Sequence, residues 1–306
     1  MTSTTLSPPA RSPLAGLMQG TAGPVLVVVA AIVAIWYGAA VLLNTPFQQG
    51  IYERAGQTDV PLTRLIADTL AQDRPVLPAP HQVAVEIWET TAEKSVTSKR
   101  SLVYHSGITL SSTLLGFLFG TALGIVLAIG VVHSRVLDKS LMPWVISSQT
   151  IPILAIAPMI IVVLNAVGIS GLLPKAFIST YLSFFPVTVG MVKGLRAPEL
   201  IQLDLMKTYS ASTSQTLWKL RLPSAMPYLF ASMKIGVAAS LVGAIVGELP
   251  TGAVAGLGAR LLAGSYYGQT VQIWSALIVA AVLAAGLVSL IGAAEKLVLK
   301  RMGMAT

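Results

Sequence analysis

The chain has no cysteine and only three histidines. Without cysteine there can be no disulfide, no thiolate metal site and no cysteine nucleophile. His81, His105 and His133 are far apart in the sequence, which does not favour a histidine metal site or a catalytic triad. We therefore predict that the chain has no catalytic residue, no metal site and no cofactor.

Charge is also scarce. Charged residues make up 10% of the chain, hydrophobic residues make up 54%, and the mean hydropathy is +0.77. Soluble domains carry about 25% charged residues. This composition excludes an ordinary soluble enzyme and is typical of a chain that crosses a membrane several times.

The sequence lacks the GxxxxGK[ST] phosphate-binding motif, so the chain is not itself a P-loop ATPase. Paired acids or metal ligands that could serve a membrane enzyme do not converge. Glu248 is the acid nearest an apolar run, but it lies about 30 Å along the helix from Pro227, at the outer interface. A proton relay is thus disfavoured, and an ATP-independent channel or carrier remains the alternative class.

Apolar runs predict an all-α membrane protein with six transmembrane helices, because each run is long enough to cross about 30 Å of hydrocarbon. The runs cover residues 24–43, 108–132, 143–164, 176–192, 227–249 and 271–294. They divide the chain into a disordered cytoplasmic tail (1–23), the first transmembrane helix (24–43), an external segment (44–107), a five-helix core (108–295) and a cytoplasmic tail (296–306).

The distribution of basic residues orients these helices. With both termini inside, eight basic residues lie in external segments. Six of these eight lie in the long segment 44–101, where the positive-inside rule weakens, so the short external segments contain only two. The remaining 12 of the 20 basic residues lie in cytoplasmic segments: Arg11, Arg135, Lys139, Lys193, Arg196, Lys207, Lys219, Arg221, Lys234, Lys296, Lys300 and Arg301. This bias accounts for the net charge of +8 without a nucleic acid partner.

The external segment is predicted to contain two short helices. Leu62, Leu65, Ile66 and Leu70 recur at helical spacing, and residues 83–91 repeat that spacing after a cluster of prolines. Two interpretations remain open for these helices. They form a solvated cover over the membrane helices, or a surface that helps to receive an external partner.

Two patterns within the apolar runs indicate packing and a pathway. Gly116, Gly120 and Gly124 form a stripe that lets another helix approach closely. Pro143, Pro152, Pro158 and Pro186 are expected to bend or break their helices, which favours a pathway where polar residues lie beside them. The pathway candidates are Gln149, Asn165, Tyr181 and Ser183, with hydrogen bonds between helices as the alternative role.

Residues 197–227 are too polar to cross a membrane and too long for a simple connection between helices. Leu200, Leu203 and Met206 predict one short helix. Ser212 and Gln215 form a capping box that opens a second helix, which Pro223 is expected to end. A compact helical pair of this kind suits docking on a cytoplasmic partner. An inert amphipathic loop is the alternative.

This segment resembles the EAA coupling loop of binding-protein-dependent ABC importer permeases. In that pattern an acid-Ala-Ala triplet is followed three residues later by Gly, and an Ile-x-Leu-Pro ending follows after nine more. Here Asp204-Leu205-Met206 occupies the triplet, Ser210 the glycine position, and Leu220-Arg221-Leu222-Pro223 the ending, with the spacing intact. The triplet thus lacks its small residues, and Ser210 replaces Gly.

Other stretches are similar to successive landmarks of the nitrate/sulfonate/taurine-type permeases, although Asn165 replaces a common Gly. They are Leu77-Pro78-Ala79-Pro80, TLSSTLLGFLFGTALGI, FFPVTVGMVKGL, VGAIVGE and Gly256-Leu257-Gly258. The resemblance implies a multi-pass permease of the bacterial inner membrane, in contact with lipid. It also implies a homodimer of this chain, two cytoplasmic ABC ATPase subunits and an external substrate-binding protein.

The resemblance further implies which residues meet the ATPase and what is transported. The coupling loop, residues 197–223, would contribute Asp204, Lys207, Tyr209, Ser210, Ala211, Gln215, Trp218, Leu222 and Pro223. The substrate would be a small organic solute or an oxyanion of the sulfonate, taurine or nitrate type. A pyrimidine thiamine precursor or a riboflavin-like heterocycle is the alternative.

Overall fold

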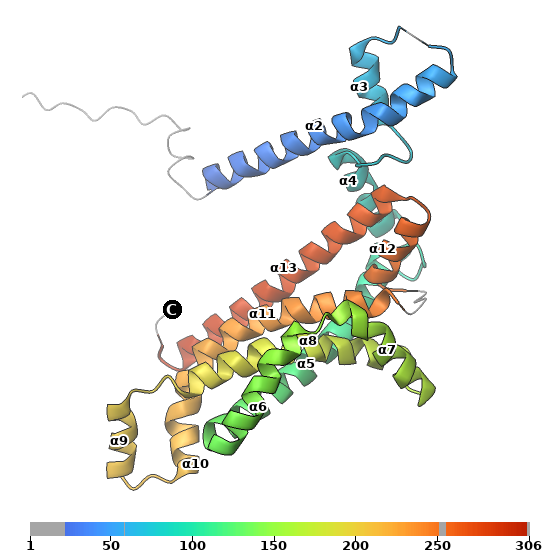
Figure 1. The fold of residues 1–306 in the computed structure, drawn as a ribbon. Helices are drawn as coiled ribbons and strands as arrows, with labels where there is room; N and C mark the ends of the chain where they lie inside the picture. The colour runs from blue at the N-terminus through green and yellow to red at the C-terminus, as the bar shows by residue number, and fades with distance from the viewer. Residues whose placement is uncertain (1–21, 58, 251–254, 305–306) are drawn as a thin grey trace, which may run out of the picture. The chain divides into compact units, whose positions relative to one another are not determined.

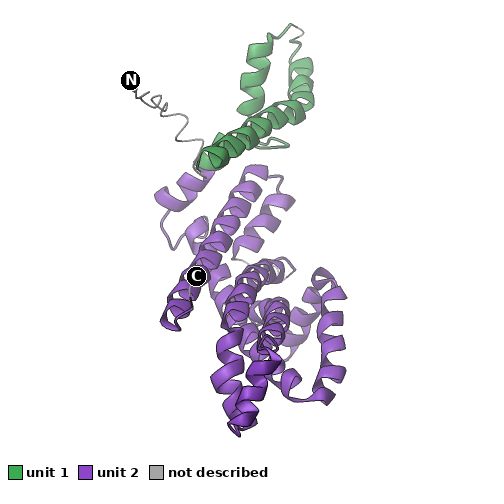
Figure 2. Ribbon diagram, turned by 90° about the vertical axis from the view of Figure 1, so that its left-hand side faces the viewer, with its two compact units in different colours: residues 1–85 green, residues 86–306 purple. Residues whose placement is uncertain are grey.

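The computed structural model describes residues 22–57, 59–250 and 255–304, and every regular element within them is helical. The predicted tail 1–23 therefore lies almost entirely outside the described residues. The chain divides into two compact units, residues 1–85 and 86–306, which Figure 2 shows in different colours.

The first unit is built on helix α2 (Ala22–Arg54), labelled in Figure 1. The described side chains in the first half of α2 are mostly apolar and exposed, as expected of a helix that faces lipid. At 1.5 Å per residue, α2 is about 50 Å long, which exceeds the roughly 30 Å of a hydrocarbon core. The helix thus continues past the predicted end at residue 43 into the polar sequence that follows.

Hydrogen bonds fix the chain that returns along the polar end of α2. The buried Asn44 accepts from the backbone amides of Val76 (2.8 Å) and Leu77 (3.1 Å) and donates to the Leu77 carbonyl (2.9 Å). Gln72 donates to the Gln48 side chain at 2.9 Å. The predicted external helices are present as α3 (Leu62–Leu70) and α4 (Pro80–Trp88), and α4 is followed by a π-helical turn (Glu89–Glu93).

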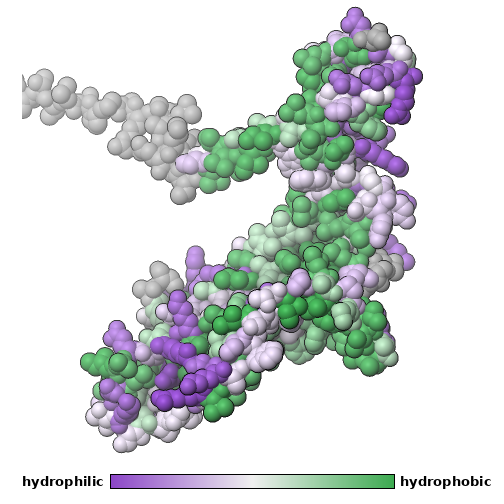
Figure 3. All heavy atoms as spheres, in the orientation of Figure 1, coloured by the Kyte–Doolittle hydropathy of each residue, from purple (hydrophilic) through white to green (hydrophobic). Residues whose placement is uncertain are grey.

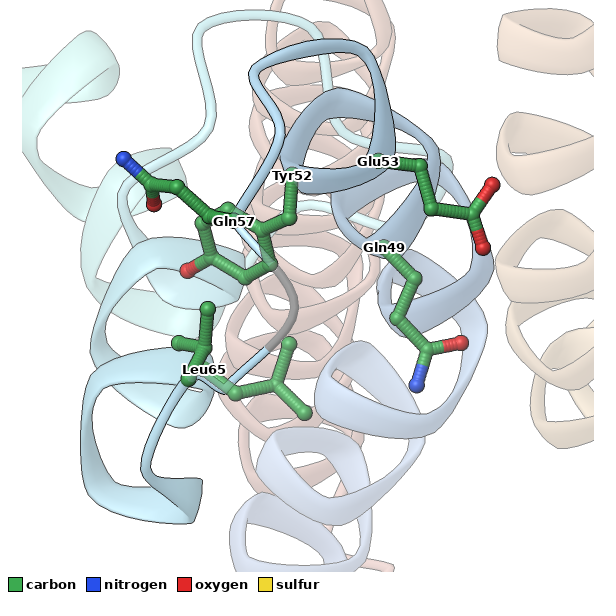
Figure 4. Close-up of a pocket in the computed structure, with 6 residues that line it drawn as sticks. Gln49, Tyr52, Glu53, Gln57 and Leu65 are labelled. Carbon is green, nitrogen blue, oxygen red and sulfur yellow. The ribbon is translucent and has the colours of Figure 1, made fainter.

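A cavity of about 400 Å³ lies beside the polar end of α2. Figure 4 shows Tyr52 and Gln49 of α2 together with Leu65 of α3 around this cavity. The Tyr52 hydroxyl donates to Asp68 at 2.5 Å, which ties α3 to α2. This part of the chain is thus held by polar contacts of its own.

The second unit contains the remaining helices. These are α5 (Leu102–His133), α6 (Arg135–Ser147), α7 (Ile153–Ala166), α8 (Leu172–Leu195), α9 (Leu200–Thr208), α10 (Thr213–Thr216), α11 (Leu222–Glu248), α12 (Leu257–Tyr266) and α13 (Thr270–Arg301). Five described helices are long and apolar enough to cross a membrane, or six if the bent pair α6 and α7 forms one span. The predicted all-α membrane fold is confirmed.

Helices α5, α8 and α11 pack side by side and form the centre of this unit (Figure 1). The predicted glycine stripe is confirmed as a packing surface. A Cβ at Gly116 would lie 2.7 Å from the Ala176 carbonyl oxygen of α8, and one at Gly124 would lie 2.9 Å from the Val187 side chain. Only glycine fits so close an approach of two helices.

The prolines break one helix and leave another continuous. The span made by α6 and α7 bends by 102° between them, where a 3₁₀ turn (Ser148–Thr150) precedes Pro152. Of the two expected outcomes, bending or breaking, a break does not occur at Pro186, since α8 runs through that residue to Leu195, and α7 likewise runs through Pro158. A single proline removes one amide donor, and close packing of α8 against α5 and α11 maintains the helix there.

Candidate functional site

The predicted two-helix segment lies at one end of the second unit, where α9 and α10 extend away from the packed helices (Figure 1). Hydrophilic side chains gather at the same end of that unit (Figure 3). Two contacts fix the base of the segment. Arg221 donates to the Leu195 carbonyl oxygen at 2.8 Å, and Arg196 pairs with Asp138 of α6 at 2.8 Å. The segment is thus attached to the ends of α6, α8 and α11.

Both helices of the segment have capped starts. The predicted capping box is confirmed, because the Gln215 amide donates to the Ser212 hydroxyl at 3.2 Å and the Gln215 side chain accepts from the Ser212 amide at 2.9 Å. Glu199 and Gln202 form a second capping box at the start of α9. These bonds satisfy amides that would otherwise lack partners at the helix starts.

Ser210 has a left-handed backbone with φ of 50°, the only non-glycine residue with positive φ among the described positions. The Ala211 amide donates to the Met206 carbonyl at 2.9 Å and the Ser210 amide to the Lys207 carbonyl at 2.8 Å. This is the bonding pattern of a Schellman motif, in which the left-handed residue is usually glycine. The pattern has glycine at this position because glycine adopts the left-handed backbone without strain. Ser210 adopts the same turn at a cost in conformational free energy.

Ser210→Gly is expected to stabilise the segment by about 1 kcal/mol, because glycine adopts the left-handed conformation without strain. Ser210→Val is expected to destabilise it, because a β-branched side chain tolerates positive φ poorly. Limited proteolysis between α9 and α10 in purified protein would measure both effects. The expected order of cleavage rates is Val fastest, then Ser, then Gly, and equal rates would contradict the argument.

The expectation that Pro223 ends the second helix is wrong. After α10 the chain forms a π-helical turn (Leu217–Arg221), and α11 follows without interruption, with Pro223 in its first turn. Proline is tolerated there because its amide needs no partner within the helix. Residues 213–248 therefore form one continuous helix, which joins the segment directly to the membrane.

The segment exposes large apolar side chains. Tyr209 is 78% exposed and Trp218 68%, and Leu200 and Ile201 of α9 are exposed to a similar degree. Asp204 and Lys207 form an exposed ion pair at 2.8 Å. Of the predicted coupling residues, Asp204, Lys207, Tyr209, Ser210, Gln215 and Trp218 are exposed, and Ala211, Leu222 and Pro223 are half-buried. Leu200 and Ile201 were not among the predicted coupling residues, since Leu200 was used only to predict the helix, although two adjacent apolar residues in a polar stretch were a usable signal.

The predicted pathway residues do not form one cluster. The Tyr181 hydroxyl donates to the Ser148 carbonyl, and Gln149 donates to the Ser148 hydroxyl at 3.4 Å, so both residues bond to Ser148 at the bend between α6 and α7. Ser183 is buried against α5 and donates to the Ser179 carbonyl at 2.8 Å. Asn165 is exposed near the end of α7.

A buried polar cluster lies at the other end of α11. Glu248 is completely buried, with the Thr109 hydroxyl of α5 3.0 Å from both carboxylate oxygens. The Gly258 amide of α12 donates to Glu248 at 2.8 Å, and the Lys175 ammonium of α8 lies 4.0 Å away. Four helices thus meet at one carboxylate, whereas sequence reasoning placed Glu248 at an interface without naming partners.

Thr109 and His105 extend this cluster to the start of α12. Thr109 accepts from the Leu257 amide at 2.9 Å, and Nδ1 of His105 accepts from the Gly256 amide at 2.9 Å. The histidine proton is therefore on Nε2, which donates to the Lys99 carbonyl at 3.0 Å. Gly256 has φ of 124°, and a Cβ at this position would collide with the Glu248 carboxylate. The Glu248 cluster, as we name it, consists of His105, Thr109, Lys175, Glu248 and residues 256–258.

An ion pair connects α12 to the segment that precedes α5. Arg260 lies 3.5 Å from Glu86. Burial raises the pKa of the Glu86 carboxyl above its ordinary value, an effect that the Arg260 charge opposes, and burial lowers the pKa of the Arg260 guanidinium. The pair adds a second fixed point to the start of α12.

Residues 120–304 match the model of the family described as "Binding-protein-dependent transport system inner membrane component". A probable ABC transporter permease protein of Haemophilus influenzae is 31% identical over 204 residues, covering 67% of this chain and 78% of the relative. The riboflavin transport system permease protein RibX of Chloroflexus aurantiacus is 31% identical over 225 residues, covering 74% and 80%. The putative aliphatic sulfonates transport permease protein SsuC of Bacillus subtilis is 24% identical over 208 residues, covering 68% and 71%.

The family match spans more than half of the chain, and the matched region contains the segment with α9 and α10, the bent span and most of the Glu248 cluster. All three relatives are transport permeases by name, and the Haemophilus influenzae relative is named as an ABC transporter permease. The chain belongs to the inner-membrane component family of binding-protein-dependent transport systems, and it is a multi-pass ABC permease subunit.

Proposed function

We propose that residues 197–223 are the docking site for a cytoplasmic ABC ATPase, which hydrolyses ATP on behalf of this non-catalytic subunit. The exposed apolar side chains on a segment fixed to three helix ends carry this proposal. Exposed aromatic residues beside charged ones are typical of an interface, because aromatic anchors supply most of the binding energy. The continuous helix 213–248 gives the ATPase a direct mechanical link to the membrane.

The rest of the assembly is proposed by analogy with the family. Two copies of this chain would form the translocation pathway, and an external binding protein would deliver the substrate. Both termini would lie in the cytoplasm, since the basic residues between α9 and the π-helical turn (Leu217–Arg221) and those at the end of α13 would then share one side. Within each copy, Gln149 and Tyr181 at the bend between α6 and α7 are our best candidates for pathway residues, because broken helices place polar groups at membrane depth.

The proposed substrate is a small organic solute or an oxyanion of the sulfonate, taurine or nitrate type, in line with the sulfonate permease among the relatives. The riboflavin permease relative supports a heterocycle as the second candidate. One structural observation favours the heterocycle. Lys175 and Lys234 of the membrane helices are each paired with a carboxylate, so neither presents a free positive charge to an anion.

Docking can be tested with two matched tyrosines. Tyr209 in the segment and Tyr266 at the end of α12 are 78% and 79% exposed. Tyr209→Ala is expected to weaken ATPase binding by about 2 kcal/mol, roughly thirtyfold, as is usual for an aromatic anchor, whereas Tyr266→Ala is expected to have no effect. The measurement is the amount of Walker-motif subunit, and of vanadate-sensitive ATP hydrolysis, that co-purifies with the tagged chain from its native membrane.

If both variants retained the ATPase equally, Tyr209 would not be an anchor of the interface. If the unaltered chain were isolated without an ATPase and none bound on reconstitution, docking itself would be refuted. The binding protein found with the complex would identify the substrate, with an aliphatic sulfonate and riboflavin as the first two compounds to test.

A further inference from the structure

An ion pair joins α11 to α13 inside the candidate membrane spans. The Lys234 ammonium contacts the Glu295 carboxylate, and their side chains are 35% and 17% exposed. At 1.5 Å per residue, Lys234 lies about 21 Å along α11 from Glu248. Lys234 is therefore within the apolar run, although the sequence analysis counted it among the cytoplasmic basic residues. Charges at such positions are costly in a bilayer unless they are paired, and they usually mark function.

The pair lies where the apolar faces of α11 and α13 approach each other. On α13, Gly292 precedes Glu295 by about one turn, and a Cβ there would lie 3.6 Å from Cε of Lys234. Next to the pair, Met233 of α11 packs against an apolar cluster that includes Phe117, Val237 and Leu287. The lysine therefore lies along α13 at the edge of the apolar contact between the two helices.

The position of the pair along the helices suggests what it does. Lys234 lies on the continuous helix 213–248, so any displacement of the docking segment moves it. Glu295 is the last acid of α13, a long helix that also packs against α12 and α5. Apolar contacts between helices resist separation but allow sliding, whereas a paired charge in an apolar setting fixes one position along the helix axis.

We propose that Lys234 and Glu295 are positioning residues that make α13 follow α11 when the ATPase moves the docking segment. This inference rests on the proposed function. In this scheme α11 receives the movement at its docking end. The pair transmits it to α13, and the Glu248 cluster fixes the opposite end of α11 to α5, α8 and α12. Loss of either charge lets α11 slide along α13, so that the two helices change their relative position during the ATPase cycle.

The absence of cysteine allows a direct test, because paired cysteines can be introduced without background labelling. Nitroxide labels are placed on two exposed residues, Val242 of α11 and Leu297 of α13, in chains mixed with an excess of unlabelled chain. The label-to-label distance is measured in the complex with its ATPase, without nucleotide and after trapping with ATP and vanadate. In the unaltered complex this distance is expected to be equal in the two states.

Lys234→Met and Glu295→Gln are each expected to shift the distance between the two states by an amount on the order of one helical turn, about 5 Å. The exchange of charges, Lys234→Glu with Glu295→Lys, is expected to restore equal distances. Lys300→Met, which removes an exposed cation further along α13, is the matched control and should behave like the unaltered chain. A purely structural role would lower stability without producing a shift that depends on nucleotide.

Equal distances in both single variants, with an active ATPase bound, would overturn the inference and leave the proposed function intact. An unaltered chain that binds no ATPase would overturn both. If the single variants fail to accumulate, the inference is tested on the double variant in which the two charges are exchanged. A shift that depends on nucleotide in that variant, or its failure to accumulate, overturns the inference.

Discussion

Replacement of Glu248 with alanine is expected to remove a large part of the stability of the second unit. The substitution leaves the Thr109 hydroxyl, the Gly258 amide and the Lys175 ammonium without their shared acceptor. Removal of one member of a buried charged network costs about 3–5 kcal/mol, compared with a total stability of about 5–15 kcal/mol. The thermal midpoint of the protein in detergent, followed by circular dichroism, should fall by roughly 10 °C.

Two further variants separate the cluster from a general effect of removing an acid. Glu248→Gln keeps an oxygen that can accept from Thr109 or Gly258, and we expect it to lower the midpoint less than alanine does. Glu93→Ala removes an exposed carboxylate and should change stability by less than about 1 kcal/mol. A Glu248→Ala protein as stable as Glu93→Ala would show that the contacts of the cluster contribute little.

The Glu248 cluster also marks the limit of what the sequence could reveal. Thr109 and Glu248 are 139 residues apart in the chain, so no local pattern indicates that they meet. The glycines at positions 256 and 258 were visible as a motif, but the atoms that require them were not: a Cβ would collide with the Glu248 carboxylate at Gly256 and with the Ile245 carbonyl oxygen at Gly258. The same holds for Lys234 and Glu295, which are 61 residues apart and were read as separate charges.

Features that depend on neighbours in sequence were predictable. The apolar runs predicted five of the membrane helices, because the length of a run compared with the bilayer thickness determines whether it can cross. The run 143–164 differs, because the bend before Pro152 divides it between α6 and α7. The capping box at Ser212 and Gln215 was predictable because both partners lie within one helical turn. The prolines were less informative, since the outcome depends on where a proline lies in the helix and on what packs around it. The span bends before Pro152, α8 continues through Pro186, and Pro223 lies in the first turn of α11.

Gly116→Leu is expected to prevent the second unit from forming its native packing. A Cβ at Gly116 would lie 2.7 Å from the Ala176 carbonyl oxygen and 3.0 Å from the Thr180 amide nitrogen, both of which are backbone atoms that cannot rotate away. The helices must therefore separate, which also breaks the hydrogen bond from the Thr180 hydroxyl to the Gly116 carbonyl (3.2 Å). Overpacking alone costs about 1–3 kcal/mol, and broken contacts along two long helices add to it.

The same substitution at Gly107 is the matched control, because Gly107 lies on the same helix and a Cβ there would have no neighbour within 4 Å. The measurement is the fraction of a fluorescent fusion that elutes as a single species in detergent. Gly107→Leu is expected to match the unaltered chain, and Gly116→Leu to aggregate or be degraded. A monodisperse Gly116→Leu protein would mean that α5 and α8 can repack at a larger separation. Since α8 leads directly into the proposed docking segment, residues 197–223, and α11 leads out of it, such a protein would also show whether the proposed coupling requires this close approach.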